Sequence, residues 1–272
     1  MSKIETIRNA LRELLAQHRQ EDTLPTSGRF LYYELLSRGI ISKEKTGARR
    51  SDQDMIDALT DLRENGEIPW DWIVDETRSI EDYTGFPTIK EGALAYLEII
   101  RLDPWDGEVP FILTESRSLA GVLRALCQQY GVRIAPTNGQ CAGFLHTQVA
   151  PKLNAWQVVL YLGDFDLCGN DIENNTRNVL EREVGELEWE RLALTEEQVE
   201  DYHLPRITKR DKRFKGNDGV HEAVETEALS QRIIVDILRE RLQQLLPEPL
   251  ENVQERAEQE RAVIRRLFEA VG

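Results

Sequence analysis

The sequence predicts a mixed α/β protein, in which a group of helices comes first and a parallel sheet with helices on its faces follows. The prediction depends on a change in hydrophobic rhythm along the chain. Up to about residue 100, apolar residues recur mostly at helical spacing. After a break at residues 102–107, short apolar runs alternate with helical segments, and this alternation is typical of a parallel sheet.

Three short helices and one extended segment are predicted in the N-terminal part. The first helix covers residues 4–19, and Thr26 and Ser27 are candidate N-caps for the second. Ser51 with Asp54 resembles a capping box that opens the third helix. A strand-like segment at residues 72–74 follows, so the outline is that of a winged helix, a variant of the DNA-binding helix-turn-helix.

The break after a predicted helix at residues 91–100 is where we expect the domain boundary. It divides the chain into a winged-helix domain over residues 1–105 and an α/β domain with a C-terminal helical extension over residues 106–272. The expected elements of the second domain are strands at 109–113, 132–135 and 158–162, a helix at 119–130, mainly helices from about residue 173, and an amphipathic helix at 251–271.

Composition limits where the protein acts and how it meets its partners. Its content of 40% hydrophobic and 31% charged residues is typical of a soluble globular protein. No apolar run approaches the roughly 20 residues of a membrane span, and no apolar signal region precedes the first helix. We therefore expect a cytoplasmic, nucleoid-associated protein with no membrane contact.

The net charge of -15 counts against a protein that coats nucleic acid, because nonspecific affinity comes from Lys and Arg neutralising phosphates. Any DNA contact must therefore come from local basic patches, although a solvated face explains such a charge run equally well. The candidates are Lys43, Lys45, Arg49 and Arg50 in one loop, and Arg206, Lys209, Arg210, Lys212, Arg213 and Lys215 in another.

The cysteines and histidines suggest no site of their own. Cys127, Cys141 and Cys168 are odd in number and widely spaced, with no CxxC pair, so neither a disulfide framework nor a structural zinc site is indicated. The four histidines show no ligand spacing, and we expect them to be structural or exposed to solvent.

Acidic residues follow two of the predicted strands. Glu115 lies just past the first strand, and Asp164 and Asp166 lie just past the third. The carboxyl ends of parallel strands meet in a common crevice, and an i, i+2 spacing sends both aspartates to one side of an extended chain. Hard oxygen ligands of this kind suit Mg²⁺, with Mn²⁺ as a substitute. The alternative is that two acids past a strand only cap the next helix.

The acids resemble those of the Toprim domain, which topoisomerases, primases and some nucleases share. Glu115 matches the lone glutamate of that domain. The segment GDFDLCGNDI at residues 163–172 is similar to the Gly-Asp-x-Asp-x-x-Gly-x-Asp-Ile segment of topoisomerase VI A subunits. The resemblance implies a Toprim fold with Glu115, Asp164 and Asp166 as the metal ligands.

A second motif, RFLYY at residues 29–33, lies on the second predicted helix. Taken alone, paired tyrosines on a helix are usually half-buried core residues. However, topoisomerase VI A subunits and the meiotic double-strand-break proteins carry Arg-x-x-Tyr-Tyr or Arg-x-x-Phe-Tyr in a winged helix directly before a Toprim domain. The resemblance implies that Tyr33 is the nucleophile, that Arg29 stabilises the phosphate, and that Tyr32 is an auxiliary packing residue. A spacing of four residues puts Arg29 and Tyr33 on one helix face.

The resemblance covers residues 24–215 and implies a type IIB topoisomerase-like enzyme that cleaves double-stranded DNA with Mg²⁺, or that breaks and rejoins it. In the family the tyrosine of one subunit works against the metal site of the other, which implies a homodimer. Residues 208–213 also resemble a basic helical stretch of that family. The chain is shorter than a full A subunit and has no ATPase module, which leaves room for a separate ATPase or SMC-like partner.

Two alternatives stay open. The architecture also resembles the DNA-cleaving subunits of Wadjet plasmid-defence systems, so a Toprim nuclease that activates water without using Tyr33 is the first. The second is a noncatalytic DNA-binding or assembly protein. Glu225 and Glu227 are near candidates for the metal crevice, but surface acids that open a helix explain them as well, so they are left outside the predicted site.

Overall fold

The computed structural model describes residues 2–42, 52–74, 82–139, 141–210 and 220–270. The N-terminal part contains three helices, α1 (Lys3–Gln20), α2 (Gly28–Ser37) and α3 (Gln53–Glu64), around a shared apolar core. The Ser27 hydroxyl accepts a hydrogen bond from the backbone N–H of Phe30, which confirms the predicted N-cap of α2. The predicted capping box of the third helix is wrong. Asp52 is the N-cap residue without a capping hydrogen bond from its side chain, and Ser51 lies outside the described residues.

The predicted extended segment after α3 is reduced to a single bridge. Trp70–Trp72 form a 3-10 turn (η1), and Ile73 pairs in parallel with Thr26. Two backbone hydrogen bonds hold this bridge, one from Thr26 to the Trp72 carbonyl and one from Val74 to the Thr26 carbonyl. The three-helix group is therefore confirmed, while a two-stranded wing is not formed within the described part of the chain.

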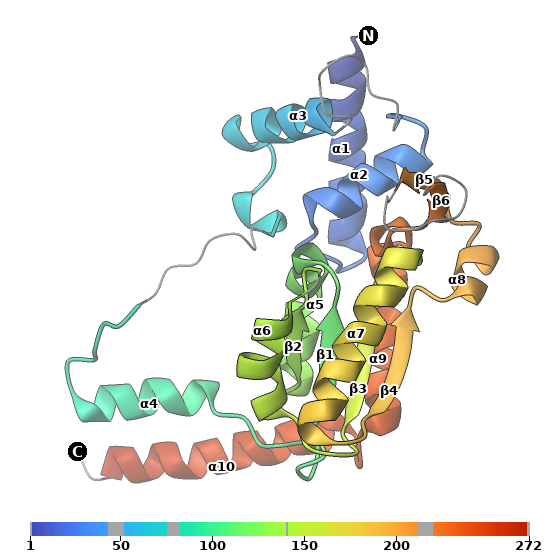
Figure 1. Ribbon diagram of the computed structural model, residues 1–272. Coiled ribbons are helices and arrows are strands. Elements are labelled where there is room, and N and C mark those ends of the chain that lie inside the picture. Colours follow the sequence, from blue (N-terminus) through green and yellow to red (C-terminus); the bar gives the residue numbers. More distant parts are fainter. Residues whose placement is uncertain (1, 43–51, 75–81, 140, 211–219, 271–272) are drawn as a thin grey trace.

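A four-stranded parallel sheet forms the centre of the molecule (Figure 1). Its strand order is β2-β1-β3-β4, and the three strands that the sequence predicts are all present. The fourth strand replaces part of the helical region expected after residue 173, so that expectation was wrong there. The strands are β1 (Phe111–Thr114), β2 (Arg133–Pro136), β3 (Val158–Leu162) and β4 (Glu188–Ala193).

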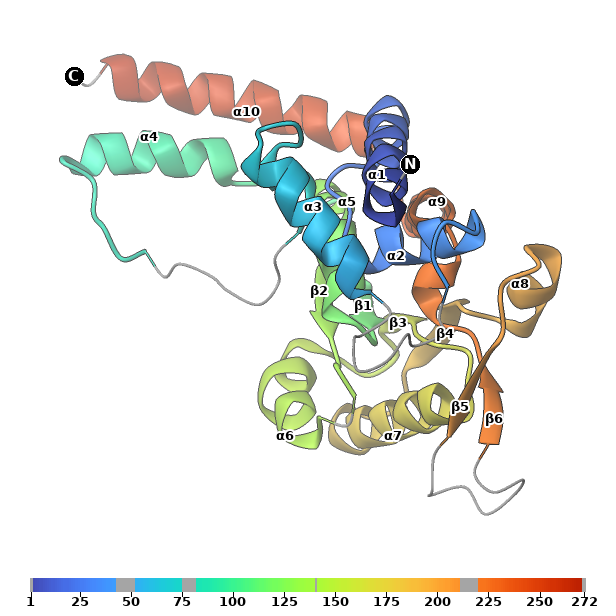
Figure 2. The same ribbon diagram turned by 90° about the horizontal axis from the view of Figure 1, so that it is seen from above.

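Helices cover both faces of the sheet (Figure 2). The reason is that successive residues of the central strands point to opposite faces and are apolar on each of them. Ile112 and Leu160 belong to the core shared with α5 (Arg117–Tyr130) and α9 (Gln231–Leu245). Leu113 and Tyr161 belong to the core on the opposite face. That face is covered by α7 (Leu167–Val184) and by the helical segment α6 (Ala142–Phe144), η2 (Leu145–Val149) and η3 (Ala150–Lys152).

A small antiparallel hairpin follows α8 (Glu196–Asp201). Its strands are β5 (Ile207–Arg210) and β6 (Val220–Ala223), with Lys209 paired to His221. The basic helical stretch expected at residues 208–213 is therefore wrong as far as Arg210, and residues 211–213 lie outside the described part. After the hairpin, the short turn η5 (Thr226–Ala228) packs against α2.

Two helices far apart in sequence form an arm. In both views α4 (Ile89–Ile99) runs beside α10 (Leu250–Ala270), and in Figure 1 the pair lies away from α1–α3 (Figures 1 and 2). Arg265 pairs with Glu98 at 2.5 Å across the two helices. The predicted C-terminal helix is confirmed. None of the described helices is both long and apolar enough to cross a membrane.

Candidate active site at the edge of the parallel sheet

The acids lie where the order of the sheet reverses. The chain passes from β1 outward to β2 and then returns to place β3 on the other side of β1. At such a point the loops after the two central strands separate and leave space for a ligand. Thr114 at the end of β1 pairs with Leu162 at the end of β3, so Glu115 and Asp164 follow neighbouring strand ends. The Glu115 carboxylate accepts a hydrogen bond from the backbone N–H of Asp164 at 3.0 Å.

Asp164 and Asp166 have different local roles. Asp166 is the N-cap of α7, and its Oδ1 accepts a hydrogen bond from the Gly169 N–H at 2.6 Å. Asp164 Oδ1 instead accepts from the backbone N–H of Thr226 at 2.9 Å and from its hydroxyl at 3.1 Å. Helix capping, the alternative considered from the sequence, thus explains one oxygen of Asp166 and leaves its second oxygen facing the site.

The glycine that follows the two aspartates, Gly169, is required by close packing of the backbone. A Cβ atom at this position would overlap the backbone carbonyl of Asp164 and crowd the Asp166 carboxylate at 3.4 Å. The loop that carries both acids therefore closes tightly on the first turn of α7 only because no side chain is present there.

Lys209 lies inside the acid cluster. Its Nζ is 2.8 Å from Asp166 Oδ2, 3.6 Å from Asp164 Oδ2 and 3.7 Å from Glu225 Oε1. Burial alone would lower the pKa of Lys209, but the hydrogen bond to Asp166 and the nearby charge of Asp164 outweigh it, so the pKa is raised. Lys209 is therefore a cation held by the site.

The other residues predicted to contact DNA are less informative. Arg210 follows Lys209 in β5, and only its backbone is described. The remaining predicted contacts, Lys43, Lys45, Arg49, Arg50, Lys212 and Arg213, lie outside the described residues.

The segment between β6 and α9 joins the N-terminal helices to the acids. Glu225 Oε2 accepts a hydrogen bond from the Tyr33 hydroxyl and pairs with Arg29 at 2.8 Å. Arg29 also lies 3.4 Å from Glu227 Oε1. The structure therefore brings Tyr33 and Arg29 on α2 to Glu225, and Lys209 links Glu225 to the strand-end aspartates.

Glu227 is fully buried next to the start of α5. Its Oε1 accepts hydrogen bonds from the hydroxyls of Ser116 and Ser118 at 2.8 and 2.9 Å. Burial raises its pKa, although Arg29 opposes the shift. In the described part of the chain its Oε2 atom is buried without a hydrogen-bond partner.

Glu225 and Glu227 are the residues that sequence reasoning left out. They form a second pair of acids at i, i+2 spacing, the same pattern that singled out Asp164 and Asp166. That signal was available, but nothing local shows that this pair meets α2, because Tyr33 and Glu225 are 192 positions apart.

The cluster has more negative than positive side chains. Five carboxylates, Glu115, Asp164, Asp166, Glu225 and Glu227, surround two cations, Arg29 and Lys209. Burial, and then the charge of Asp164, raise the pKa of Glu115 to about 7. Crowded carboxylates with unmet charge suit a hard divalent cation, so the donor set fits Mg²⁺.

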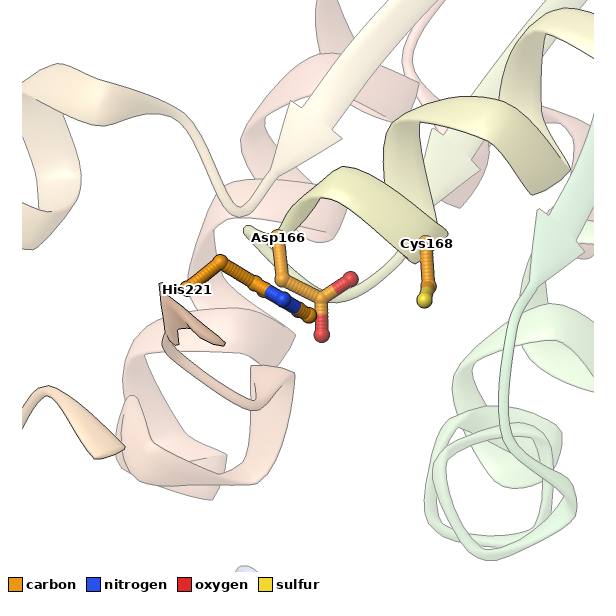
Figure 3. A group of neighbouring side chains, drawn as sticks. All are labelled: Asp166, Cys168 and His221. Carbon is orange, nitrogen blue, oxygen red and sulfur yellow. The ribbon is translucent and has the colours of Figure 1, made fainter. Parts of the chain in front are cut away.

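The predicted metal ligands are close but do not form the most compact ligand group. Among the described residues, the group whose ligand atoms all lie within 4.8 Å of one another is Asp166, Cys168 and His221 (Figure 3). Lys209 bridges Asp164 and Asp166, so a cation shared by these aspartates requires its ammonium to move.

No protein-family model matches the chain, and neither the curated proteins nor the solved structures contain a match to it. What the site can do therefore follows from the contacts of its own residues.

Proposed function

We propose that this protein is a winged-helix and Toprim enzyme that cleaves double-stranded DNA by tyrosine transesterification, similar to topoisomerase VI A subunits. The observation that supports the proposal best is the meeting of Tyr33, Arg29 and the strand-end acids around Glu225. A helix residue and a sheet-edge cluster contribute to one polar site, and each part holds the groups that the reaction needs.

Tyr33 needs a proton acceptor before it can attack phosphorus. Burial, and then the hydrogen bond to Glu225, raise its pKa, while Arg29 opposes the shift. The phenol is therefore protonated at neutral pH. Burial also acts to raise the pKa of Glu225, but the hydrogen bond from Tyr33 and the charge of Arg29 lower it overall, so Glu225 is an anion that faces the phenol proton.

The proposed step forms a bond between Tyr33 Oη and a DNA phosphorus and breaks the bond from that phosphorus to the 3′ oxygen of the neighbouring nucleotide. Glu225 receives the phenol proton, and the departing 3′ oxygen takes a proton from solvent. Arg29 carries the positive charge that stabilises the phosphate oxygens. The product is a DNA 5′ end linked to Tyr33, and reversal of the same step rejoins the strand.

The strand-end acids supply the second part of the proposed site. Glu115, Asp164 and Asp166 would hold Mg²⁺ or Mn²⁺, which when bound stabilises negative charge on the phosphodiester. Asp164 is tied through Thr226 to the segment that carries Glu225, so the metal ligands and the proton acceptor are held in one arrangement.

The proposed partners follow the same resemblance. We propose that duplex DNA of the nucleoid is the substrate, that the basic residues near 43–50 and 209–213 contact its backbone, and that two copies act together. Lys209 and Arg29 are already paired with carboxylates, so DNA phosphates have to compete for them. A separate ATPase or SMC-like partner remains part of the proposal.

The test is a covalent adduct. Purified protein is incubated with labelled duplex DNA and Mg²⁺ or Mn²⁺, the reaction is stopped with detergent, and protein-linked 5′ ends are measured. Wild type and Tyr32→Phe should form adduct, and Tyr33→Phe should form none and cleave nothing. Both variants remove only a hydroxyl, so each is the control for the other. Cleavage by Tyr33→Phe at the wild-type rate would show that the covalent mechanism is wrong.

A Toprim nuclease that activates water is the second candidate, and Glu115 favours it. With Asp164 and Asp166, Glu115 would hold a metal at the strand ends, and such a metal lowers the pKa of its bound water, so that no tyrosine is needed as the nucleophile. This reaction should survive in Tyr33→Phe and disappear in Glu115→Gln. Binding of DNA by wild type with no cleavage under any of these conditions would instead indicate the noncatalytic alternative.

A further inference from the structure

We propose that Asp166, Cys168 and His221 form a binding site for a transition-metal ion of the Zn²⁺ class, whose ligand chemistry differs from that of the Mg²⁺ site. Their ligand atoms all lie within 4.8 Å of one another. Figure 3 shows the His221 ring and the Cys168 sulfur on either side of the Asp166 carboxylate. The proposal depends only on this grouping, and it holds whether or not the protein cleaves DNA.

Each of the three side chains starts from a fixed backbone. Asp166 is held as the N-cap of α7 by its hydrogen bond with Gly169. Cys168 lies in the first turn of the same 18-residue helix. His221 lies on β6, and the bridge between Phe165 and Val224 ties the chain just after β6 to the loop of Asp166. Backbone contacts therefore hold the two segments that carry the three side chains next to each other.

The donor types decide which metal fits. A thiolate and an imidazole select Zn²⁺ or Co²⁺ over Mg²⁺, which prefers oxygen ligands. Three protein ligands leave the fourth tetrahedral position for water. Ligand atoms on one tetrahedral metal are about 3.5 Å apart, so the present spread of up to 4.8 Å has to contract by about 1 Å.

Binding at this site changes the position of Lys209. Its ammonium is 2.8 Å from Asp166 Oδ2, and Lys209 is the cross-strand partner of His221. A divalent ion on Asp166 repels that ammonium, so the lysine has to leave this carboxylate. Asp166 is also one of the proposed Mg²⁺ ligands, and the two ions would therefore compete for it.

Cobalt gives a test that does not need enzyme activity. Metal-free, reduced full-length protein is titrated with Co²⁺ alone, and its near-ultraviolet and visible absorption is recorded. We expect a thiolate-to-cobalt charge-transfer band with tetrahedral visible bands, and we expect equimolar Zn²⁺ to remove both. Cys168→Ser should abolish the charge-transfer band, and His221→Gln should weaken Co²⁺ binding by about tenfold or more.

Matched controls distinguish this site from nonspecific binding of Co²⁺ by other thiols or imidazoles. Cys141→Ser and His146→Gln change the same residue types outside the group and should leave the cobalt spectrum as in wild type. A wild-type protein without the charge-transfer band, or a Cys168→Ser variant with an unchanged spectrum and native circular dichroism, would overturn the proposal.

Discussion

The Tyr33 hydroxyl on α2 donates a hydrogen bond to the carboxylate of Glu225, which follows the β5–β6 hairpin. This contact ties the helix that carries the proposed nucleophile to the loop that also positions Asp164 through Thr226. Arg29, one helical turn before Tyr33, pairs with the same Glu225 oxygen. The two motifs singled out in the sequence are therefore connected through a residue that belongs to neither of them.

Glu225→Gln should slow adduct formation by Tyr33 about 100-fold or more, because the amide cannot accept the phenol proton as a carboxylate does. The measurement is the initial rate of detergent-stable adduct at saturating DNA. Glu222→Gln is the matched control, since Glu222 lies on β6 just before Glu225 and pairs with Arg206 outside the cluster. An unchanged rate in Glu225→Gln would reduce Glu225 to a residue that only positions α2.

Divalent-ion binding should respond in opposite directions to two substitutions. Asp164→Ala removes a proposed ligand and should weaken Mg²⁺ or Mn²⁺ binding. Lys209→Met removes a positive charge 3.6 Å from Asp164 and should tighten binding by about tenfold or more. Calorimetric titration measures both, with Arg206→Gln, directly before β5, as a control. Equal affinity in wild type and Asp164→Ala would remove Asp164 from the metal site.

Gly169→Ala should destabilise the fold by about 1–3 kcal/mol, because the new methyl group overlaps the Asp164 carbonyl and the loop has to shift. Gly143→Ala is the control, since nothing lies within 4 Å of a Cβ built there. Urea unfolding followed by circular dichroism gives both free energies. If the two variants are equally stable, the loop accommodates the methyl group and the glycine is not required for closure.

The sequence predicted the parts of the fold that local patterns specify. β1 and β3 are mainly buried apolar residues, so the sequence predicted where these strands lie. It also predicted that the acids directly after them lie at the strand ends. β4 was missed because its first four residues, Glu188–Arg191, include three charged side chains and only its last two residues are buried. β5 and β6 have four residues each, too few to tell a strand period from a helical one.

The site residues that belong to local motifs were predicted from the sequence. The site contacts between segments far apart in the chain were not. Glu115, Asp164, Tyr33 and Arg29 were proposed from motifs, and the structure brings them to one cluster. Lys209 was assigned to a DNA-binding patch because its neighbours in sequence are basic, whereas its neighbours in space are carboxylates. Contacts of this kind join segments far apart in the chain, and the spacing of apolar residues along the sequence does not predict such contacts.

Stability should depend on pH through Glu115 in the metal-free protein. Its pKa is about 7 in the folded protein and 4.5 as the reference value for the unfolded chain. Between these values the folded state keeps a proton that the unfolded state loses, so the contribution of Glu115 to stability falls as pH rises from 4.5 to 7 and is constant outside this window. Allowing for partial solvent exposure, the loss is on the order of 1–2 kcal/mol.

The measurement for Glu115 is the unfolding free energy from urea titrations across this pH range in the presence of EDTA. Glu115→Gln carries no titrating group and should remove this part of the slope, while Glu108→Gln, an exposed glutamate before β1, should keep it. A Glu115→Gln variant with the full wild-type slope would assign the dependence to another carboxyl.

The final prediction concerns assembly, and the arm of α4 and α10 supplies its surface. Ile99 and Leu267 are 66% and 61% exposed on these two helices, although both are large apolar residues. Exposed apolar groups gathered on a projecting arm favour burial against another surface. A second copy offers the same arm, and a twofold contact between identical arms buries both at once. We therefore expect a dimer of 31.3 kDa subunits, at least when DNA is present.

Sedimentation velocity at several protein concentrations, with and without DNA, tests this expectation. Ile99→Glu combined with Leu267→Glu should shift the dimer to monomer, whereas Ile56→Glu on α3 should not, because Ile56 lies on the three-helix group and not on the arm. Tyr33 already contacts Glu225 of its own chain, so the dimer is not needed to bring these two residues together. A strict monomer under all conditions would rule out a site shared between subunits, and any cleavage would then come from the residues of one chain.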